Sequence, residues 1–472
     1  MLMGISSLSD TRYYDKIKNL AVAFFMFMLV GRFINLYWAL PRKIDSVAFL
    51  GISFFAILFV CLDLIKNKKI YTAPNLMCLL FFTVSCAVSC LIYVEYGWAG
   101  NLKSLISIFV SLFFLYPFAS VNGIEKTKKI IIILQKILVV MWFVAALISI
   151  ITFLLQYSSI FYVGGTRILV GCIENRLFGF FSDPNYASIV SILTIIFSVA
   201  ILNYKNQSKL MRIICVCNIV AQFIYIVLGA SRTGEVCLLL TLLVSSFVYS
   251  YKLNPSSKFY AVVIRIFAAI CLCVFVHYLI GAVRLVLSYA PSVFKAVFGL
   301  DYSQSGFVLH QVSMERPDVA QTTDISNLRF RIWGSALEIF RTTWLFGASP
   351  RNALLYASDV LPKSFIVARG YDAHNFYVAI LLYTGSLGAI FLGFFLIKSA
   401  YLIIKHYFKN HFSVSDAFFN SLALSALCIA ASGMFLSEIL FITTLGSFFF
   451  WLFLGYIMST IDCKSKCDFE DR

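Results

Sequence analysis

A histidine and two further polar residues lie immediately before a long apolar run in the last quarter of the chain. The stretch YDAHNFYVAI (371–380) carries Asp372, His374 and Asn375. A neutral imidazole within reach of a hydroxyl group can act as a general base, and a neighbouring carboxylate can orient it. Asp372 or Asn375 can equally cap the helix that the apolar run predicts, since aspartate and asparagine are preferred at that position.

Arginines recur in three other polar stretches. These are NRLFGFFSDPNYASIV, GASRTGE and DISNLRFRIWGSALEIFRTTWLFGASPRN, which begin at residues 175, 229 and 324. The planar guanidinium group of arginine suits two-point binding of phosphate. The candidate catalytic residues are His374, Arg329 and Arg232. The candidate substrate-binding residues are Arg167, which lies upstream of the first stretch, with Arg176, Asp183, Asn185, Arg331, Asp372 and Asn375.

The first two stretches also have purely structural interpretations. Ser182 or Asp183 can cap a helix, and Pro184 suits the first turn of that helix. Arg232 and Glu235 can form an ion pair on the surface. These interpretations explain the capping residues, but they do not explain why arginines recur.

The third stretch predicts an amphipathic helix at 326–344. Apolar residues recur there at helical spacing, and arginines occupy the polar side. Ser326 or Asn327 can cap this helix, and Gly347 can end it, as glycine commonly does just past a helix. A basic amphipathic helix can also lie on lipid headgroups, so that interpretation stands beside substrate binding.

Membrane helices are the elements that must position these residues. The chain of 472 residues is 61% hydrophobic and 13% charged, whereas globular proteins average about 25% charged residues. Apolar runs of roughly 20 residues are long enough to cross a bilayer. They predict an all-α polytopic membrane protein with about twelve transmembrane helices, at 20–40, 46–65, 74–94, 103–121, 130–155, 185–203, 212–229, 235–251, 259–281, 375–397, 417–435 and 439–459.

The basic residues indicate the orientation of these helices. Lysines and arginines gather in every second connection, and the positive-inside rule makes that side the cytoplasm, with both termini inside. The net charge of +16 is spread over these short connections, so we expect no nucleic-acid partner. The opposite side carries a loop at 156–184 and one long extracytoplasmic loop with short amphipathic helices. The expected division is transmembrane helices 1–9 in 1–281, the long loop in 282–374, helices 10–12 in 375–460 and a cytoplasmic tail in 461–472.

This topology brings the arginines and the histidine to the outer face. Arginine can hold the diphosphate of an anionic, lipid-linked substrate without a metal. We expect no metal, no other cofactor and no structural disulfide, because the 13 cysteines lie mostly within apolar runs. Glu438 is an ionisable residue near the outer end of the last span, and its role stays open.

Four stretches together resemble the O-antigen polymerase and O-antigen ligase superfamily. They are NRLFGFFSDPNYAS, SRTGE, LRFRIWGSALEIFRTTWLFGASP and AHNFYVAILLYTGSLGAIFL, in the order of the family and within residues 160–400. Arg329 matches the arginine four residues before a tryptophan, and His374 matches the histidine of a His-Asn pair. Arg176 and Arg232 match the arginines of the earlier motifs. The element GASPRN departs from the family, because it has one glycine where the family is glycine-rich.

The resemblance implies a metal-independent glycosyltransferase of the bacterial inner membrane that acts on its outer face. It would polymerise oligosaccharide repeat units, linked to undecaprenyl diphosphate, into O-antigen, capsule or exopolysaccharide. His374 would accept the proton of the acceptor hydroxyl, while Arg232, Arg329 and Arg176 would bind the diphosphate. The expected partners are the undecaprenyl-diphosphate-linked glycan donor and acceptor, membrane lipid and a chain-length regulator protein.

Two alternatives stay open. One is an O-antigen ligase of the same superfamily, which transfers the glycan to lipid A-core. The other is a flippase or exporter of lipid-linked sugars. A transporter usually carries charges along a central pathway and often has internal repeats, whereas here the charges gather on one face.

Overall fold

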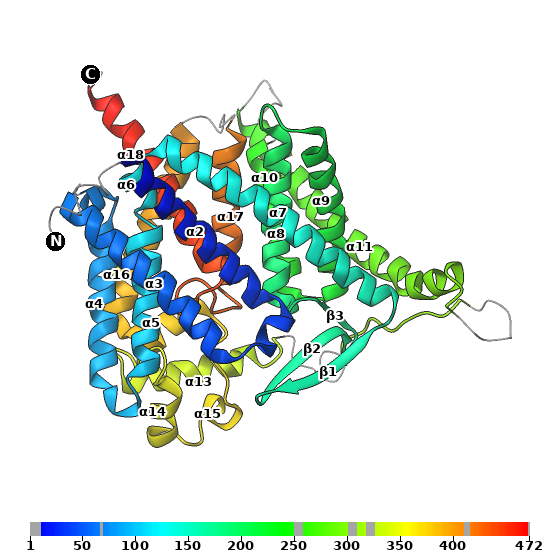
Figure 1. The fold of residues 1–472 in the computed structure, drawn as a ribbon, viewed down its shortest axis with the longest axis horizontal. Coiled ribbons are helices and arrows are strands. Elements are labelled where there is room, and N and C mark those ends of the chain that lie inside the picture. Colours follow the sequence, from blue (N-terminus) through cyan, green and yellow to red (C-terminus); the bar gives the residue numbers. More distant parts are fainter. Residues whose placement is uncertain are drawn as a thin grey trace.

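The protein is a bundle of long helices with a small sheet and three short helices at one end (Figure 1). The computed structural model describes residues 11–66, 69–249, 258–300, 309–317, 326–409 and 416–470. Parts of the long loop expected at 282–374, and of the lysine-rich connections near residues 68 and 252, lie outside the described residues.

Each of the twelve expected spans overlaps helical structure, and the span at 103–121 consists of α5, a π-helix (Val110–Leu115) and α6. Eight helices in the described part are long and apolar enough to cross a membrane, and two more are apolar but shorter. The prediction of an all-α polytopic membrane protein is therefore confirmed. The helices are α2 (Thr11–Phe33), α3 (Arg42–Lys66), α4 (Leu76–Ile92), α5 (Ala99–Phe109) with α6 (Phe118–Asn122), α7 (Ile124–Leu154), α8 (Pro184–Asn203), α9 (Lys209–Gly229), α10 (Arg232–Tyr249), α11 (Lys258–Val297), α16 (Phe376–Lys409), α17 (Ala417–Ser432) and α18 (Leu445–Glu470).

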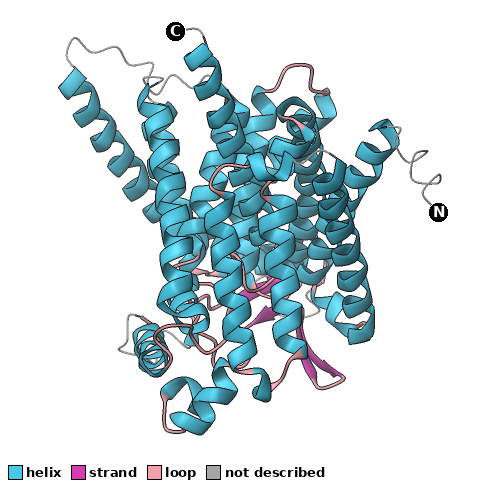
Figure 2. Ribbon diagram, turned by 90° about the vertical axis from the view of Figure 1, so that its left-hand side faces the viewer, coloured by secondary structure: helices cyan, strands magenta, loops and turns pink. Residues whose placement is uncertain are grey.

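The two ends of the bundle differ in what they carry. Strands and short helices gather at one end, which we name the loop end (Figures 1 and 2). Helix α2 begins, and helix α18 ends, at the opposite end (Figure 1). Helix α11 continues to Val297, so the connection that follows it starts later than residue 282.

A three-stranded antiparallel sheet occupies most of the segment expected as a loop at 156–184. Its strands are β1 (Ser158–Val163), β2 (Thr166–Ile173) and β3 (Arg176–Gly179). Gly164 and Gly165, both with positive φ, form the two-residue turn between the first two strands. A Gly-Gly pair between β-branched and aromatic residues is a hairpin signal, so the sequence contained this information.

The side chain of Asn35 fastens the sheet to the end of helix α2. Its Nδ2 donates to the carbonyl groups of Leu169 and Gly179, at 2.8 and 2.9 Å, while it is almost fully buried. A backbone hydrogen bond from Ser182 N to Phe33 O, at 2.8 Å, also joins the segment after the sheet to the end of α2. The sheet therefore fixes where helix α8 begins.

The amphipathic helix expected at 326–344 is helix α13 (Arg329–Thr342). Neither Ser326 nor Asn327 takes the capping position, which is Leu328, but Ser326 Oγ accepts from Phe330 N at 3.5 Å in the first turn of the helix. Asn327 and Leu328 both have positive φ, at 49° and 67°, so the chain enters the helix through a left-handed turn. Gly347 does not end the helix directly either, since it follows the end by several residues. Helices α14 (Ala353–Val360) and α15 (Phe365–Arg369) complete the loop end.

Two glycines clamp the segment after α13 onto helix α16. Gly347 has φ of +71°, and Gly385 interrupts α16 with φ of +64°. A Cβ on Gly347 would meet backbone atoms at 2.5 Å. Backbone hydrogen bonds close the contact, from Ala348 N to Leu382 O at 2.7 Å and from Ser386 N to Trp344 O at 2.8 Å. The single glycine of GASPRN is therefore the one that this contact requires.

Replacement of Gly347 by alanine is expected to destabilise the protein markedly. The left-handed backbone alone costs about 1–2 kcal/mol for a residue with a Cβ, and the contact with the backbone of α16 adds to it. Thermal unfolding of the purified protein in detergent would measure the loss. Gly393→Ala is the control, because Gly393 lies in α16 with nothing within 4 Å of its added Cβ. Equal unfolding temperatures for both variants would contradict the clamp.

Candidate functional site

Three arginines from separate segments line one pocket at the loop end, which we name the arginine pocket. Its volume is about 350 Å³, and Arg232, Arg316 and Arg329 line it. Arg232 is the first residue of α10, and Arg329 is the first residue of α13. Arg316 comes from the connection between α11 and α13, and it donates from Nη1 to the carbonyl oxygen of Ala230 at 2.9 Å.

Arg329 is partly buried, whereas Arg232 is exposed. Its Nη2 donates to Thr233 Oγ1 at 3.2 Å, and its guanidinium carbon lies 5.0 Å from the ring centre of Phe435. Burial lowers the pKa of Arg329, and the positive charges of Arg232 and Arg316 lower it further. The same field that disfavours a third cation favours a bound anion, so the pocket suits a phosphate or diphosphate group.

Asn185 forms the wall of the arginine pocket at the start of helix α8. Its Oδ1 accepts from Arg176 Nη2 and from Ser231 Oγ, both at 3.0 Å. Arg176 also donates from Nε to Gly229 O at 3.1 Å. Arg176 thus lies behind the pocket and holds Asn185 in place.

The predicted cap of helix α8 is confirmed. Asp183 is the capping residue, its Oδ1 accepts from Asn185 N at 2.7 Å, and Pro184 occupies the first turn. Asp183 does not line the arginine pocket but a second cavity, described below. At the start of α10, Ser231 Oγ accepts from Gly234 N at 3.0 Å. Glu235 contacts His277 Nδ1 at 2.7 Å.

His374 is exposed and lies just before helix α16. Its φ of 46° is uncommon for a residue other than glycine, and such conformations are often found at functional sites. Asn375 is buried and caps α16, because its Oδ1 accepts from Tyr377 N at 2.9 Å and from Val378 N at 3.1 Å.

Asp372 is not hydrogen-bonded to His374 within the part of the chain that the structure describes. Its Oδ1 accepts instead from the hydroxyl of Tyr383 and from the backbone N–H of Ala373. The carboxylate thereby links the segment just before α16 to a side chain of that helix. It contributes to the position of His374 through the backbone, not through the imidazole.

Two chains of contacts connect His374 with the arginines. Phe376 N donates to Gly433 O at 2.7 Å, and Phe435, two residues further, carries Arg329 on its ring. On the other side, ring contacts run from His374 to Tyr371, from Tyr371 to Phe365, and from Phe365 to the guanidinium of Arg331, at 6.0, 6.3 and 4.4 Å. His374 therefore belongs to the same end of the bundle as the arginine pocket.

Arg331 and Arg167 also lie outside the arginine pocket. Arg331 rests on Phe365, and Arg167 is exposed near the tip of the β1–β2 hairpin, where it pairs with Tyr162. Among the arginines of the pocket, Arg316 was not predicted from the sequence. No motif surrounds Arg316, and only the folded connection brings it to the pocket.

Glu438 is fully buried in the loop between α17 and α18. Ser432 Oγ donates to its Oε1, while Oε2 has no hydrogen-bond partner among the described residues. Burial raises the pKa of Glu438 to about 7. The folded protein thus binds the proton of Glu438 more tightly than the unfolded chain does. The contribution of this protonation to the free energy of unfolding is complete below pH ~4.5 and is lost as the pH rises to about 7.

Glu438→Gln is expected to raise the unfolding temperature at pH 8 and to change it little at pH 4.5. The shift from 4.5 to about 7 corresponds to roughly 3 kcal/mol, at about 1.4 kcal/mol for each pH unit. Thermal unfolding at the two pH values would measure the effect. Glu338→Gln, at an exposed position of α13, is the control. A gain of equal size at both pH values would contradict a buried carboxyl group that ionises on this interval.

The central part of the chain matches a known family. Residues 216–393 match the family model described as O-antigen ligase, and no curated protein matches the chain. The matched segment runs from α9 into α16 and contains Arg232, Arg316, Arg329 and His374. The match confirms the resemblance to the O-antigen polymerase and ligase superfamily. Together with the apolar helices, it supports a membrane protein with a ligase-type or polymerase-type function in surface polysaccharide synthesis.

Proposed function

We propose that the protein is a membrane glycosyltransferase that polymerises oligosaccharide repeat units linked to undecaprenyl diphosphate. The observation that carries this proposal is the convergence of Arg232, Arg316 and Arg329 in one pocket, at the same end of the bundle as the helix start that bears His374. All four residues lie within the segment that matches the O-antigen ligase family. A pocket that favours an anion, at the same end of the bundle as a side chain able to accept a proton, suits a donor with a diphosphate leaving group.

The proposed reaction is a direct displacement at the anomeric carbon of the donor sugar. A hydroxyl oxygen of the acceptor sugar forms the new bond to that carbon, and its proton passes to a ring nitrogen of His374. The bond between the anomeric carbon and the diphosphate oxygen breaks, and the electron pair leaves with the lipid diphosphate. Arg232, Arg316 and Arg329 stabilise the charge that builds on this leaving group, and no metal ion takes part. Asn185 and Arg176 shape the wall of the pocket.

The proposed orientation places the loop end outside the cytoplasm. Lysines concentrate in the connections at the opposite end, and the positive-inside rule assigns that end, with both termini, to the cytoplasm. The lipid-linked substrates would then reach the arginine pocket from the outer leaflet of the plasma membrane. A cysteine introduced at Arg167, on the exposed hairpin, should react with a membrane-impermeant thiol reagent in whole cells.

A ligase is the second candidate, and the description of the matching family favours it. Purified protein supplied with only a lipid-diphosphate-linked repeat unit separates the possibilities. A polymerase elongates the glycan and releases lipid diphosphate, a ligase does so only when lipid A-core is added, and a lipid flippase releases none. In cells that lack the protein, loss of a polymerase leaves a single repeat on the acceptor, whereas loss of a ligase leaves none.

A further inference from the structure

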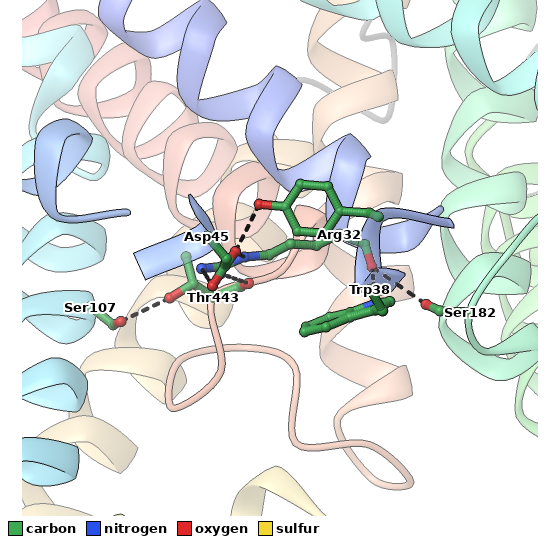
Figure 3. Close-up of polar contacts among 7 residues, drawn as sticks. Arg32, Trp38, Asp45, Ser107, Ser182 and Thr443 are labelled. Carbon is green, nitrogen blue, oxygen red and sulfur yellow. Dashed lines mark hydrogen bonds and ion pairs between the residues drawn. The ribbon is translucent and has the colours of Figure 1, made fainter. Parts of the chain in front are cut away.

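A second cavity at the loop end contains basic side chains and shares no residue with the arginine pocket. We name it the basic cavity. Its volume is about 520 Å³, and it lies among the ends of α2 and α3, helix α5, and the loops before α8 and α18 (Figure 3). Its charged lining residues are Arg32, Arg42, Asp45, Lys103, Asp183 and Arg351.

The carboxylate of Asp45 is engaged by neighbours within the cavity wall. Arg32 binds it from Nε and Nη2, at 2.7 and 3.1 Å, and the hydroxyl of Tyr37 donates to it at 2.9 Å. Arg32 also donates from Nη1 to Thr443 O at 3.2 Å, and Figure 3 shows this network. Asp45 therefore holds the guanidinium group of Arg32 at the cavity.

Three cations of the lining form no ion pair with a carboxylate within the described ranges of the chain, and one of them, Arg42, donates from Nη2 to Thr166 Oγ1 at 2.8 Å. Lys103 has no ion pair there, and its Nζ lies 5.4 Å from the ring centre of Phe49. Arg351 donates from Nε to Ser104 Oγ at 3.1 Å. Asp183, the other acidic lining residue, accepts the backbone N–H that starts α8. The cavity thus has an excess of positive charge.

Aromatic side chains form one wall of the same cavity. Trp38 is 37% exposed, and its indole N–H donates to Arg32 O at 3.0 Å, which fixes the ring plane (Figure 3). Tyr37 meets it edge to face, with ring centres 5.9 Å apart. A fixed aromatic face beside cations suits a ligand that has both an apolar surface, such as the C–H groups of a sugar ring, and a negative charge.

We propose that the basic cavity binds the phosphate groups of a second phosphate-bearing glycolipid, the acceptor of the proposed transfer. This inference rests on the proposed function, because joining two lipid-linked glycans requires two anionic head groups at one enzyme. Like charges repel, so the two head groups need separate sites. Arg351 also lines an adjoining hollow of about 370 Å³ that contains Asp372, two residues before His374. The hollow offers the acceptor glycan a route from the basic cavity toward the candidate base.

The number of binding sites for a polyprenyl diphosphate tests this inference. The full-length protein in detergent is dialysed against radiolabelled farnesyl diphosphate, and bound probe is counted per chain. The wild type is expected to bind two equivalents. Lys103→Gln should weaken one of them about 10- to 100-fold, as expected for the loss of a charged contact to phosphate, and leave the other unchanged. Lys103→Gln with Arg351→Gln should remove that equivalent.

Two controls make the outcomes separable. Lys43→Gln removes the same charge from an exposed neighbour of the cavity and should leave both equivalents intact. Arg232→Gln with Arg329→Gln should remove the other equivalent only. Two equivalents in a folded Lys103→Gln, Arg351→Gln variant would overturn the second site alone, whereas two equivalents in the Arg232, Arg329 variant would overturn the proposed function. Displacement of the Lys103-dependent equivalent by phosphatidylglycerol micelles as readily as by farnesyl diphosphate would show a site for bulk lipid headgroups and also overturn the inference.

Discussion

Cells that carry Arg329→Ala are expected to make no long-chain glycan, although the protein still reaches the membrane. Arg329 is a partly buried member of the arginine pocket, and two other guanidinium groups already act on it. Loss of a donor that stabilises developing charge in such a site typically slows the reaction by about 10²–10³-fold. Gel analysis of the surface glycan, with turnover by the purified variant, would measure this loss.

The control for Arg329 lies on the same helix. Arg341 is exposed in the last turn of α13 and lines no described pocket, so Arg341→Ala removes an equal charge and should leave chain length unchanged. Arg329→Lys should recover only part of the rate, because lysine keeps the charge but loses the planar two-point contact. Normal chain lengths in Arg329→Ala cells would exclude this residue from the reaction.

The second large effect is expected at His374. His374→Asn should reduce turnover by about 10²–10⁴-fold, the range for a general base. Asparagine is the appropriate replacement because it tolerates the left-handed backbone that His374 adopts, so the start of α16 should stay intact. Binding of farnesyl diphosphate in the arginine pocket should be preserved, which separates loss of the base from loss of the site.

His310→Asn serves as the comparison, since His310 is exposed in the connection after α11 and lines no described pocket. It should turn over substrate like the wild type. If His374→Asn retained normal turnover while Arg329→Ala did not, the arginine pocket would stand and another group would have to accept the proton.

The membrane helices could be predicted from the sequence because a long apolar run has one conformation of low free energy in lipid, the α-helix. A helix satisfies every backbone polar group within its own segment, so length and composition decide the matter. The cap of α8 followed equally from local chemistry, as Asp183 and Pro184 act within one turn. The amphipathic helix that begins with Arg329 was found for the same reason, by its periodicity.

The arrangement of the site could be predicted only in part. Topology brings Arg232 and Arg329 to one end, but Arg316 joins them through a connection that has no repeating pattern. Asp372 carries the right chemistry to orient His374, yet Tyr383 takes its carboxylate, and tertiary packing alone decides that choice. Arg32 shows the same limit, because its partner Asp45 lies on the next helix and no local rule pairs them.

The contact between Gly347 and Gly385 also joins the two helices that carry the chemistry into one rigid unit. Arg329 stands at the head of α13 and His374 just ahead of α16, and backbone hydrogen bonds join the end of one helix to the middle of the other. In the proposed reaction, the spacing between leaving group and base is then a property of the scaffold and is present before any glycan arrives. The fold thus fixes the distance between the site of the leaving group and the base, and this distance decides which sugar hydroxyl reacts.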